Sequence, residues 1–281
     1  MRRLSDHGHE ATVMTDVLSA RSSASKRQGD GEGGALEMRV LLAADGSEAA
    51  RIAEGWILRL GWAVQPRVDI LCVAQPRRLA AGIGLQTYRD AVREAVAGLR
   101  QADLLQALRM ANSVGERLQS ARLVTRAWAR VGSASSELSA MVRTEAPDLL
   151  VIGGGCRRSW FSRRDTASEV LGQVDVATLV VRTAPEGEHR LPRRVAALTS
   201  EGGGTQFREW LGQTGWLDGT EVIVRRLEDL HEIDPDARPD LAVVGRPGQS
   251  RIPDLLVRTA LESVSAVLVL PFAPSPDRSA A

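Results

Sequence analysis

A glycine turn followed by a basic loop carries the residues of this sequence that are best suited to chemistry. Gly153, Gly154 and Gly155 follow an apolar run. The next residues include four arginines, Arg157, Arg158, Arg163 and Arg164. Glycines let backbone N–H groups approach an anion, and guanidinium groups bind phosphate through paired hydrogen bonds. The pattern indicates phosphate binding, and a solvated basic loop is the alternative interpretation.

The other reactive side chains are not arranged for catalysis. Cys156 stands beside Arg157, which would stabilise a thiolate, but a buried inert cysteine explains the residue equally well. The four histidines have neither metal-ligand spacing nor an evident nucleophile beside them. The turn at 45–47 lacks the glycines of a nucleophile elbow. We therefore predict that the protein is not an enzyme and has no metal site.

Composition argues against several classes of function. The formal net charge is +1 at pH 7, which removes the general electrostatic case for nucleic acid. No apolar run approaches the roughly 20 residues that span a bilayer. Two widely separated cysteines form no disulfide framework, which fits a reducing compartment. We expect a soluble, cytoplasmic protein with neither a nucleic-acid nor a membrane partner.

Apolar runs alternate with helical patterns in the first part of the chain. Four runs are almost continuously apolar, as in strands covered on both faces: 40–44, 68–73, 149–152 and 178–181. A further strand is predicted at 123–129, and helices are predicted at 48–60, 88–118 and 135–143. The apolar residues of the long helical stretch are Val92, Val96, Leu99, Leu104, Leu105 and Leu108. This order predicts an α/β fold with a doubly wound parallel sheet.

The chain also contains an internal duplication with a smaller second copy. Pro-Asp-Leu triplets at 147–149 and 239–241 each lead through an apolar run into a glycine cluster. Trp56 and Trp62 recur at the spacing of Trp210 and Trp216. Almost nothing in the second copy corresponds to the helical stretch 88–118, so that copy has lost at least one helix.

The predicted domain boundaries follow from the repeat and from composition. Ser, Gly and charged residues dominate the N-terminal segment, and prolines and a glycine mark the junction between the copies. The predicted segments are a disordered tail at 1–37, a larger domain at 38–183, a linker at 184–192, a truncated domain at 193–272 and a second disordered tail at 273–281. Ligands of doubly wound sheets lie at the carboxyl ends of the strands, where Asp45, Val73 and Gly153 all fall.

Three motifs resemble the universal stress protein family. They are Leu42-Ala43-Ala44-Asp45-Gly46-Ser47-Glu48, Pro147-Asp148-Leu149-Leu150-Val151-Ile152-Gly153 and Ala177-Thr178-Leu179-Val180-Val181-Arg182. Residues 38–183 resemble one full domain and residues 193–272 a truncated second one, so the chain resembles a tandem member. The resemblance implies a small α/β fold that often binds ATP, commonly dimerises through its last strand and mostly lacks established catalysis.

The resemblance also implies a nucleotide site, which this sequence carries in degenerate form. Asp45 matches the acidic position that contacts the nucleoside, Val73 the position that meets adenine through its backbone, and Gly153 the first phosphate-binding glycine. Cys156 stands where the second glycine is expected, and Arg164-Asp165 replaces a Gly-Ser/Thr pair. Arginines could replace the lost backbone donors. The predicted cofactor-binding residues are Asp45, Val73, Gly153, Gly155, Arg157 and Arg164, for ATP or another adenine nucleotide.

Two functions follow from these patterns. The first is a non-catalytic, stress-response binding module with a degenerate adenine-nucleotide site. The alternative is a protein-interaction scaffold that no longer binds nucleotide and uses the Trp160-Phe161 loop or the last strands as its interface. The two differ in whether the groove beside Asp45 and Gly153 is open or is filled by the loop 157–164.

The resemblance further implies pairing through the last strands, Thr178–Val181 and Val267–Leu270. Such pairing forms either a homodimer or an intramolecular pseudo-dimer, and the sequence is compatible with both. A protein client is a further predicted partner.

Overall fold

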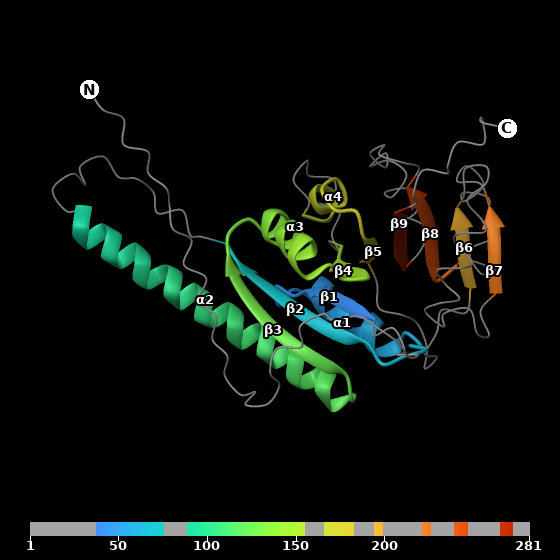
Figure 1. Ribbon diagram of the computed structural model, residues 1–281, viewed down its shortest axis with the longest axis horizontal. Helices are drawn as coiled ribbons and strands as arrows, with labels where there is room; N and C mark the ends of the chain where they lie inside the picture. The colour runs from blue at the N-terminus through green and yellow to red at the C-terminus, as the bar shows by residue number, and fades with distance from the viewer. Residues whose placement is uncertain are drawn as a thin grey trace, which may run out of the picture. The chain divides into compact units, whose positions relative to one another are not determined.

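A computed structural model describes seven stretches of the chain: residues 38–75, 89–154, 166–182, 194–198, 221–225, 239–246 and 265–271. The predicted tails at 1–37 and 273–281 and the linker at 184–192 lie outside the described residues. Figure 1 shows the helices and strands of the described part.

The first domain contains strands and helices in alternation, as the sequence predicts. Its strands are β1 (Arg39–Ala43), β2 (Arg67–Ala74), β3 (Val124–Val131), β4 (Leu149–Gly153) and β5 (Ala177–Val181). Its helices are α1 (Glu48–Arg59), α2 (Arg89–Ser120), α3 (Ala134–Glu145) and α4 (Thr166–Leu171). Four further strands follow: β6 (Arg194–Leu198), β7 (Glu221–Arg225), β8 (Leu241–Arg246) and β9 (Ala266–Pro271). Predicted and observed boundaries differ by about two residues at most, as is usual for element ends.

One sheet contains all nine strands, in the order β3-β2-β1-β4-β5-β9-β8-β6-β7. Every described pair is parallel except β5 with β9, which is antiparallel. Residues of α1 and α2 join the buried cluster on one face of the sheet, and residues of α3 and α4 join the cluster on the other. The predicted doubly wound α/β fold is therefore confirmed.

The register of the strands in the second half repeats that of the first half. Three pairs correspond: β1–β2 with β6–β7, β1–β4 with β6–β8, and β4–β5 with β8–β9. In these pairs Leu149 faces Ala177 and Leu241 faces Ala266. Ala177 and Ala266 thus occupy equivalent positions, and counting two residues along each strand makes Leu179 equivalent to Leu268.

The antiparallel pairing of β5 with β9 joins these equivalent positions. Leu179 faces Leu268, Thr178 faces Val269 and Val180 faces Val267. The centre of this antiparallel pairing therefore joins two residues at corresponding positions of their strands. All residues described on the two strands here are buried.

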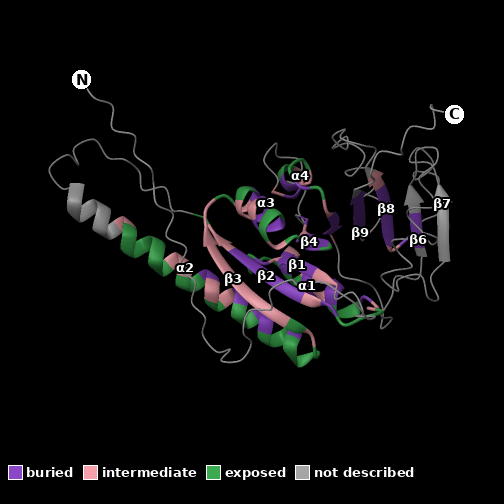
Figure 2. Cartoon of the chain, viewed as in Figure 1, coloured by how far each residue is buried: buried purple, intermediate pink, exposed green. Residues whose placement is uncertain are grey.

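Four apolar side chains in the described part of α2 are buried against the sheet: Ala107, Ala111, Val114 and Leu118. Two of the leucines that help to predict the helix, Leu99 and Leu105, are instead 37% and 47% exposed. Figure 2 shows buried, intermediate and exposed residues along α2. None of the helices in the described ranges combines the length and the apolar content needed to cross a bilayer.

A buried ion pair joins α1 to α2. The guanidinium of Arg117 donates hydrogen bonds to both carboxylate oxygens of Glu54, at 2.7 and 2.8 Å. The Glu54 side chain is 8% exposed and the Arg117 side chain 49% exposed. Arg117 can therefore be solvated without its partner, whereas the Glu54 carboxylate depends on Arg117 to compensate for its burial.

This asymmetry predicts unequal effects of removing the two partners. Arg117→Leu should lower the free energy of unfolding by about 2–3 kcal/mol, because it leaves a buried carboxylate without its donor. Glu54→Leu should cost about 1 kcal/mol or less, since water replaces the carboxylate at Arg117. Urea denaturation of both variants measures the difference. Equal losses would show that burial of the carboxylate does not determine the strength of this contact.

Candidate functional site

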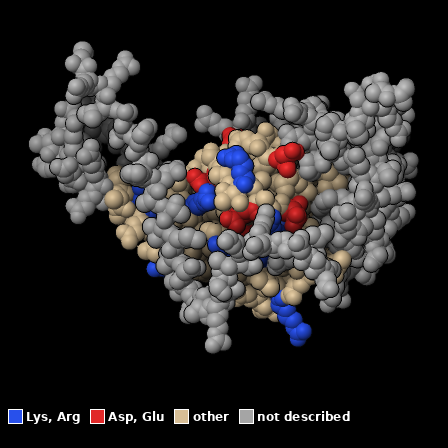
Figure 3. All heavy atoms as spheres, viewed as in Figure 1, with Lys and Arg blue, Asp and Glu red and all other residues tan. Residues whose placement is uncertain are grey.

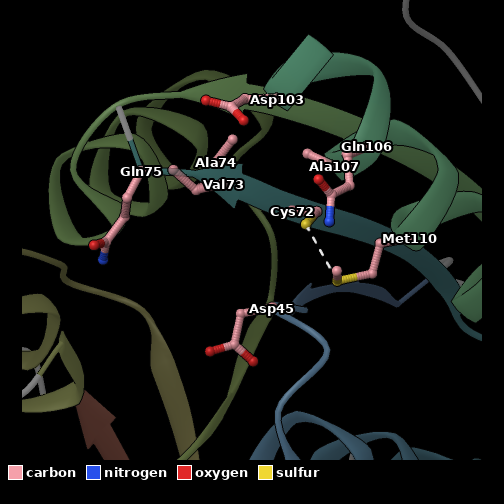
Figure 4. A pocket seen from close by; sticks show the side chains of 9 residues that line it. All are labelled: Asp45, Cys72, Val73, Ala74, Gln75, Asp103, Gln106, Ala107 and Met110. Carbon is pink, nitrogen blue, oxygen red and sulfur yellow. Dashed lines mark hydrogen bonds between the residues drawn. The ribbon is translucent and has the colours of Figure 1, made fainter. Parts of the chain in front are cut away.

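A cavity of about 220 Å³ lies at the carboxyl ends of β1 and β2, against α2 (Figure 4). Its lining residues come from the turn after β1, the end of β2 and the middle of α2. They are Asp45, Cys72, Val73, Ala74, Gln75, Asp103, Gln106, Ala107 and Met110. The carboxyl ends of parallel strands are where doubly wound sheets bind their ligands. This cavity is therefore the candidate binding site.

The turn between β1 and α1 holds Asp45 at the cavity. Gly46 has φ +76°, a left-handed conformation that glycine adopts without steric cost. The backbone N–H of Ser47 donates to Oδ1 of Asp45 at 2.9 Å. Ser47 then caps α1, because its Oγ accepts a hydrogen bond from the N–H of Ala50 at 3.1 Å. The Asp-Gly-Ser sequence thus fixes the start of the helix and leaves the exposed Asp45 carboxylate beside the cavity.

The face of α2 above β2 supplies side chains that the sequence did not assign to the site. Asp103, Gln106, Ala107 and Met110 are spaced three, four and seven residues apart, so they share one side of the helix. This spacing is visible in the sequence. However, the larger leucines of the same helix predict that a different side is buried. Only the packing of the helix shows which side faces the strands.

Cys72 lies at the back of the cavity and is 3% exposed. Burial, with a smaller contribution from the charge of Asp45, raises the pKa of its thiol to about 11. The thiol is therefore protonated near neutral pH, and its Sγ lies 3.7 Å from Sδ of Met110 as a hydrogen-bond donor.

Gly153 lies at the end of β4, where it pairs with Val181, and it does not line the cavity. A Cβ at this position would lie 2.4 Å from both the carbonyl carbon and the carbonyl oxygen of Ala49. The first turn of α1 therefore occupies the space beside Gly153, and packing alone requires glycine here. The structure brings Asp45 and Val73 together in the cavity lining. Gly155, Arg157 and Arg164 lie outside the described residues, as does the loop 157–164.

The electrostatics of the described part are mixed. Figure 3 shows basic and acidic side chains interspersed over the described portion of the face it draws. The lining residues of the cavity include two carboxylates, Asp45 and Asp103, and no Lys, Arg or His. Within the described stretches, no group of three or more His, Cys, Asp or Glu side chains is arranged to hold a metal ion.

Comparison with known proteins identifies the family. The sequence model of the universal stress protein family matches residues 38–182. The chain belongs to the universal stress protein family. A search of curated protein sequences gives no match.

Solved structures of this family share the fold. A universal stress protein from Archaeoglobus fulgidus is 14% identical, with a TM-score of 0.55, over 83% of this chain and 95% of its own. A putative universal stress protein from Pseudomonas aeruginosa is 12% identical, with a TM-score of 0.47, over 84% of this chain and 94% of its own. A family member from Arabidopsis thaliana, solved with AMP bound, is 14% identical, with a TM-score of 0.37, over 54% of this chain and 97% of its own. The first match extends beyond the residues that the family model covers.

The close packing around Gly153 predicts that a larger residue at this position destabilises the protein, whether or not a ligand is bound. Gly153→Ala should lower the free energy of unfolding by about 1–3 kcal/mol, because its Cβ would overlap the backbone of α1. Gly55→Ala is the matched control, since a Cβ at Gly55 meets nothing within 4 Å and alanine favours a helix. Denaturant unfolding compares the two variants. Equal stability of the two would show that the Gly153 contact with Ala49 yields without cost.

Proposed function

We propose that this protein is a stress-response binding module whose cavity takes an adenine nucleotide, without a catalytic step. The observation that carries the proposal is the cavity at the carboxyl ends of β1 and β2, with both Asp45 and Val73 in its lining. Family membership supports the same assignment. In this proposal the Asp45 carboxylate accepts hydrogen bonds from the sugar, and the backbone at Val73 contacts the base.

The phosphate side of the proposed site is assigned to the glycine turn and the basic loop. Gly153 lets α1 pack closely against the strand end, and Gly155, Arg157 and Arg164 are proposed to donate hydrogen bonds to phosphate oxygens. Arginine donors of this kind would offset the loss of the second family glycine. Because the motif is incomplete, we expect weaker binding than a complete motif gives.

The groups that line the cavity support binding rather than chemistry. Among the described lining residues, the ionisable side chains are those of Asp45, Cys72 and Asp103. The raised pKa of Cys72 leaves it without nucleophilic character at neutral pH. None of the described lining residues is a histidine or lysine that would serve as a base near pH 7.

Calorimetric titration of ATP and ADP into the full chain tests the nucleotide assignment. We expect saturable heat at or below millimolar nucleotide. Asp45→Ala should weaken the affinity by roughly 10- to 150-fold, the equivalent of one charge-assisted hydrogen bond. Asp175→Ala, which removes an exposed carboxylate before the amino end of β5, is the control and should bind as the native protein does. No heat at millimolar nucleotide would contradict the assignment.

The interaction scaffold is the second candidate function. In this alternative, the exposed Leu99 and Leu105 of α2 contribute apolar surface to a contact with a protein client. The cavity that contains Asp45 and Val73 favours nucleotide instead. A native protein that gives no heat with ATP or ADP would move the assignment to the scaffold.

We further propose that the chain is a duplicated, tandem protein whose two copies pair as an intramolecular pseudo-dimer. The repeated register of three strand pairs and the central position of Leu179 and Leu268 support this arrangement. In the pseudo-dimer, β9 pairs with one edge of β5. Without β9, that edge would be free to pair with a strand of a second chain.

Disulfide trapping distinguishes the pseudo-dimer from a homodimer. In a Cys156→Ser background, Leu179→Cys with Leu268→Cys should form a bond within one chain, because directly opposed residues of antiparallel strands lie within reach of a disulfide. Leu179→Cys alone should give no covalent dimer, whereas a homodimer through β5 would place its two copies of residue 179 together. Non-reducing electrophoresis separates these products, and a covalent dimer from the single variant would overturn the proposal.

A further inference from the structure

Two sulfur atoms meet inside the cavity and play no part in the nucleotide assignment. Sγ of Cys72, on β2, lies 3.7 Å from Sδ of Met110, on α2, and both residues line the cavity (Figure 4). A thiolate and a thioether are both soft ligands, which favour Cu(I) over harder cations such as Mg²⁺ and Ca²⁺.

The separation of the two sulfurs suits a single shared cation. With metal–sulfur bonds of about 2.3 Å, a separation of 3.7 Å corresponds to a sulfur–metal–sulfur angle of about 110°. Such a bent arrangement leaves room for a further donor. Asp45 and Gln106 line the same cavity and carry side-chain oxygens.

Local packing holds both sulfur donors in place. Cys72 lies on β2, which is paired on both sides by β1 and β3. A Cβ on Gly46 would lie only 2.8 Å from Sδ of Met110, so the absence of a side chain at Gly46 creates the space for this sulfur. Donors held on a paired strand and a packed helix lose little freedom when they bind a ligand.

The charges around the sulfur pair favour a cation. Asp45 and Asp103 line the cavity with the pair, and no described lining residue is basic. The thiol proton already lies between the two sulfurs as a hydrogen bond. A cation would take the place of this proton, which would leave to solvent.

We propose that Cys72 and Met110 form a binding site for one Cu(I) ion within the cavity. The proposal does not rest on nucleotide binding, because no nucleotide contact enters it.

Anaerobic titration of the full chain with Cu(I), in competition with a chromophoric Cu(I) chelator, tests the proposal. Cys156→Ser is used as the background, because Cys156 is the other cysteine of the sequence. This protein should bind one equivalent. Adding Met110→Leu should weaken the affinity about tenfold or more, and adding Cys72→Ala should abolish competition with the chelator.

Met141→Leu is the matched control, since Met141 is a fully buried thioether on α3 outside the cavity. It should leave the affinity for Cu(I) unchanged. Circular dichroism and thermal unfolding of each variant confirm that it is folded, and the conservative Met110→Leu change keeps the test valid if Cys72→Ala does not fold. Equal affinities of Met110→Leu and Met141→Leu, or no binding by Cys156→Ser, would overturn the proposal.

Discussion

The close approach of helices to the carboxyl ends of the strands is the constraint on which the candidate site depends. Gly153 lets the backbone of α1 pack directly against the end of β4, and Gly46 makes room for Met110 of α2. A side chain at Gly153 would overlap the backbone of α1, and one at Gly46 would displace the side chain of Met110 from the cavity. The ion pair between Glu54 and Arg117 ties the same two helices together away from the cavity.

The chemistry of the cavity divides into two parts. Its described lining carries carboxylates, amides and sulfur, which suit hydroxyl groups, a base or a soft cation better than phosphate. In the proposed function, the phosphate donors come from the glycine turn and the basic loop that follow β4. The proposed site would then keep its nucleoside side and have an altered phosphate side. It also means that a nucleotide and a cation would share one space.

The pairing of β5 with β9 decides which strand occupies the edge of β5. An edge strand with unpaired backbone groups attracts a partner strand. Here the partner comes from the same chain, and the pairing centres on Leu179 and Leu268. The edge of β5 next to β9 is thus already paired.

The sequence by itself determined the fold class, the positions of the strands and the family, because these depend on local patterns. Continuous apolar runs, helical spacing and motifs such as Asp45-Gly46-Ser47 are readable without knowledge of distant contacts. The same patterns placed Asp45 and Val73 at strand ends, where the cavity lies.

Only the tertiary structure decided which side of α2 faces the strands, why position 153 is glycine, and which strand pairs with β5. Asp103, Gln106 and Met110 join the site because the side of α2 that carries them, with the buried Ala107, is the one that packs toward the strand ends. The sequence marks Gly153 as a candidate phosphate residue, and the structure adds that a Cβ there would overlap the backbone of Ala49. Each of these features depends on the distance between segments remote in sequence, which no local pattern of residue types specifies.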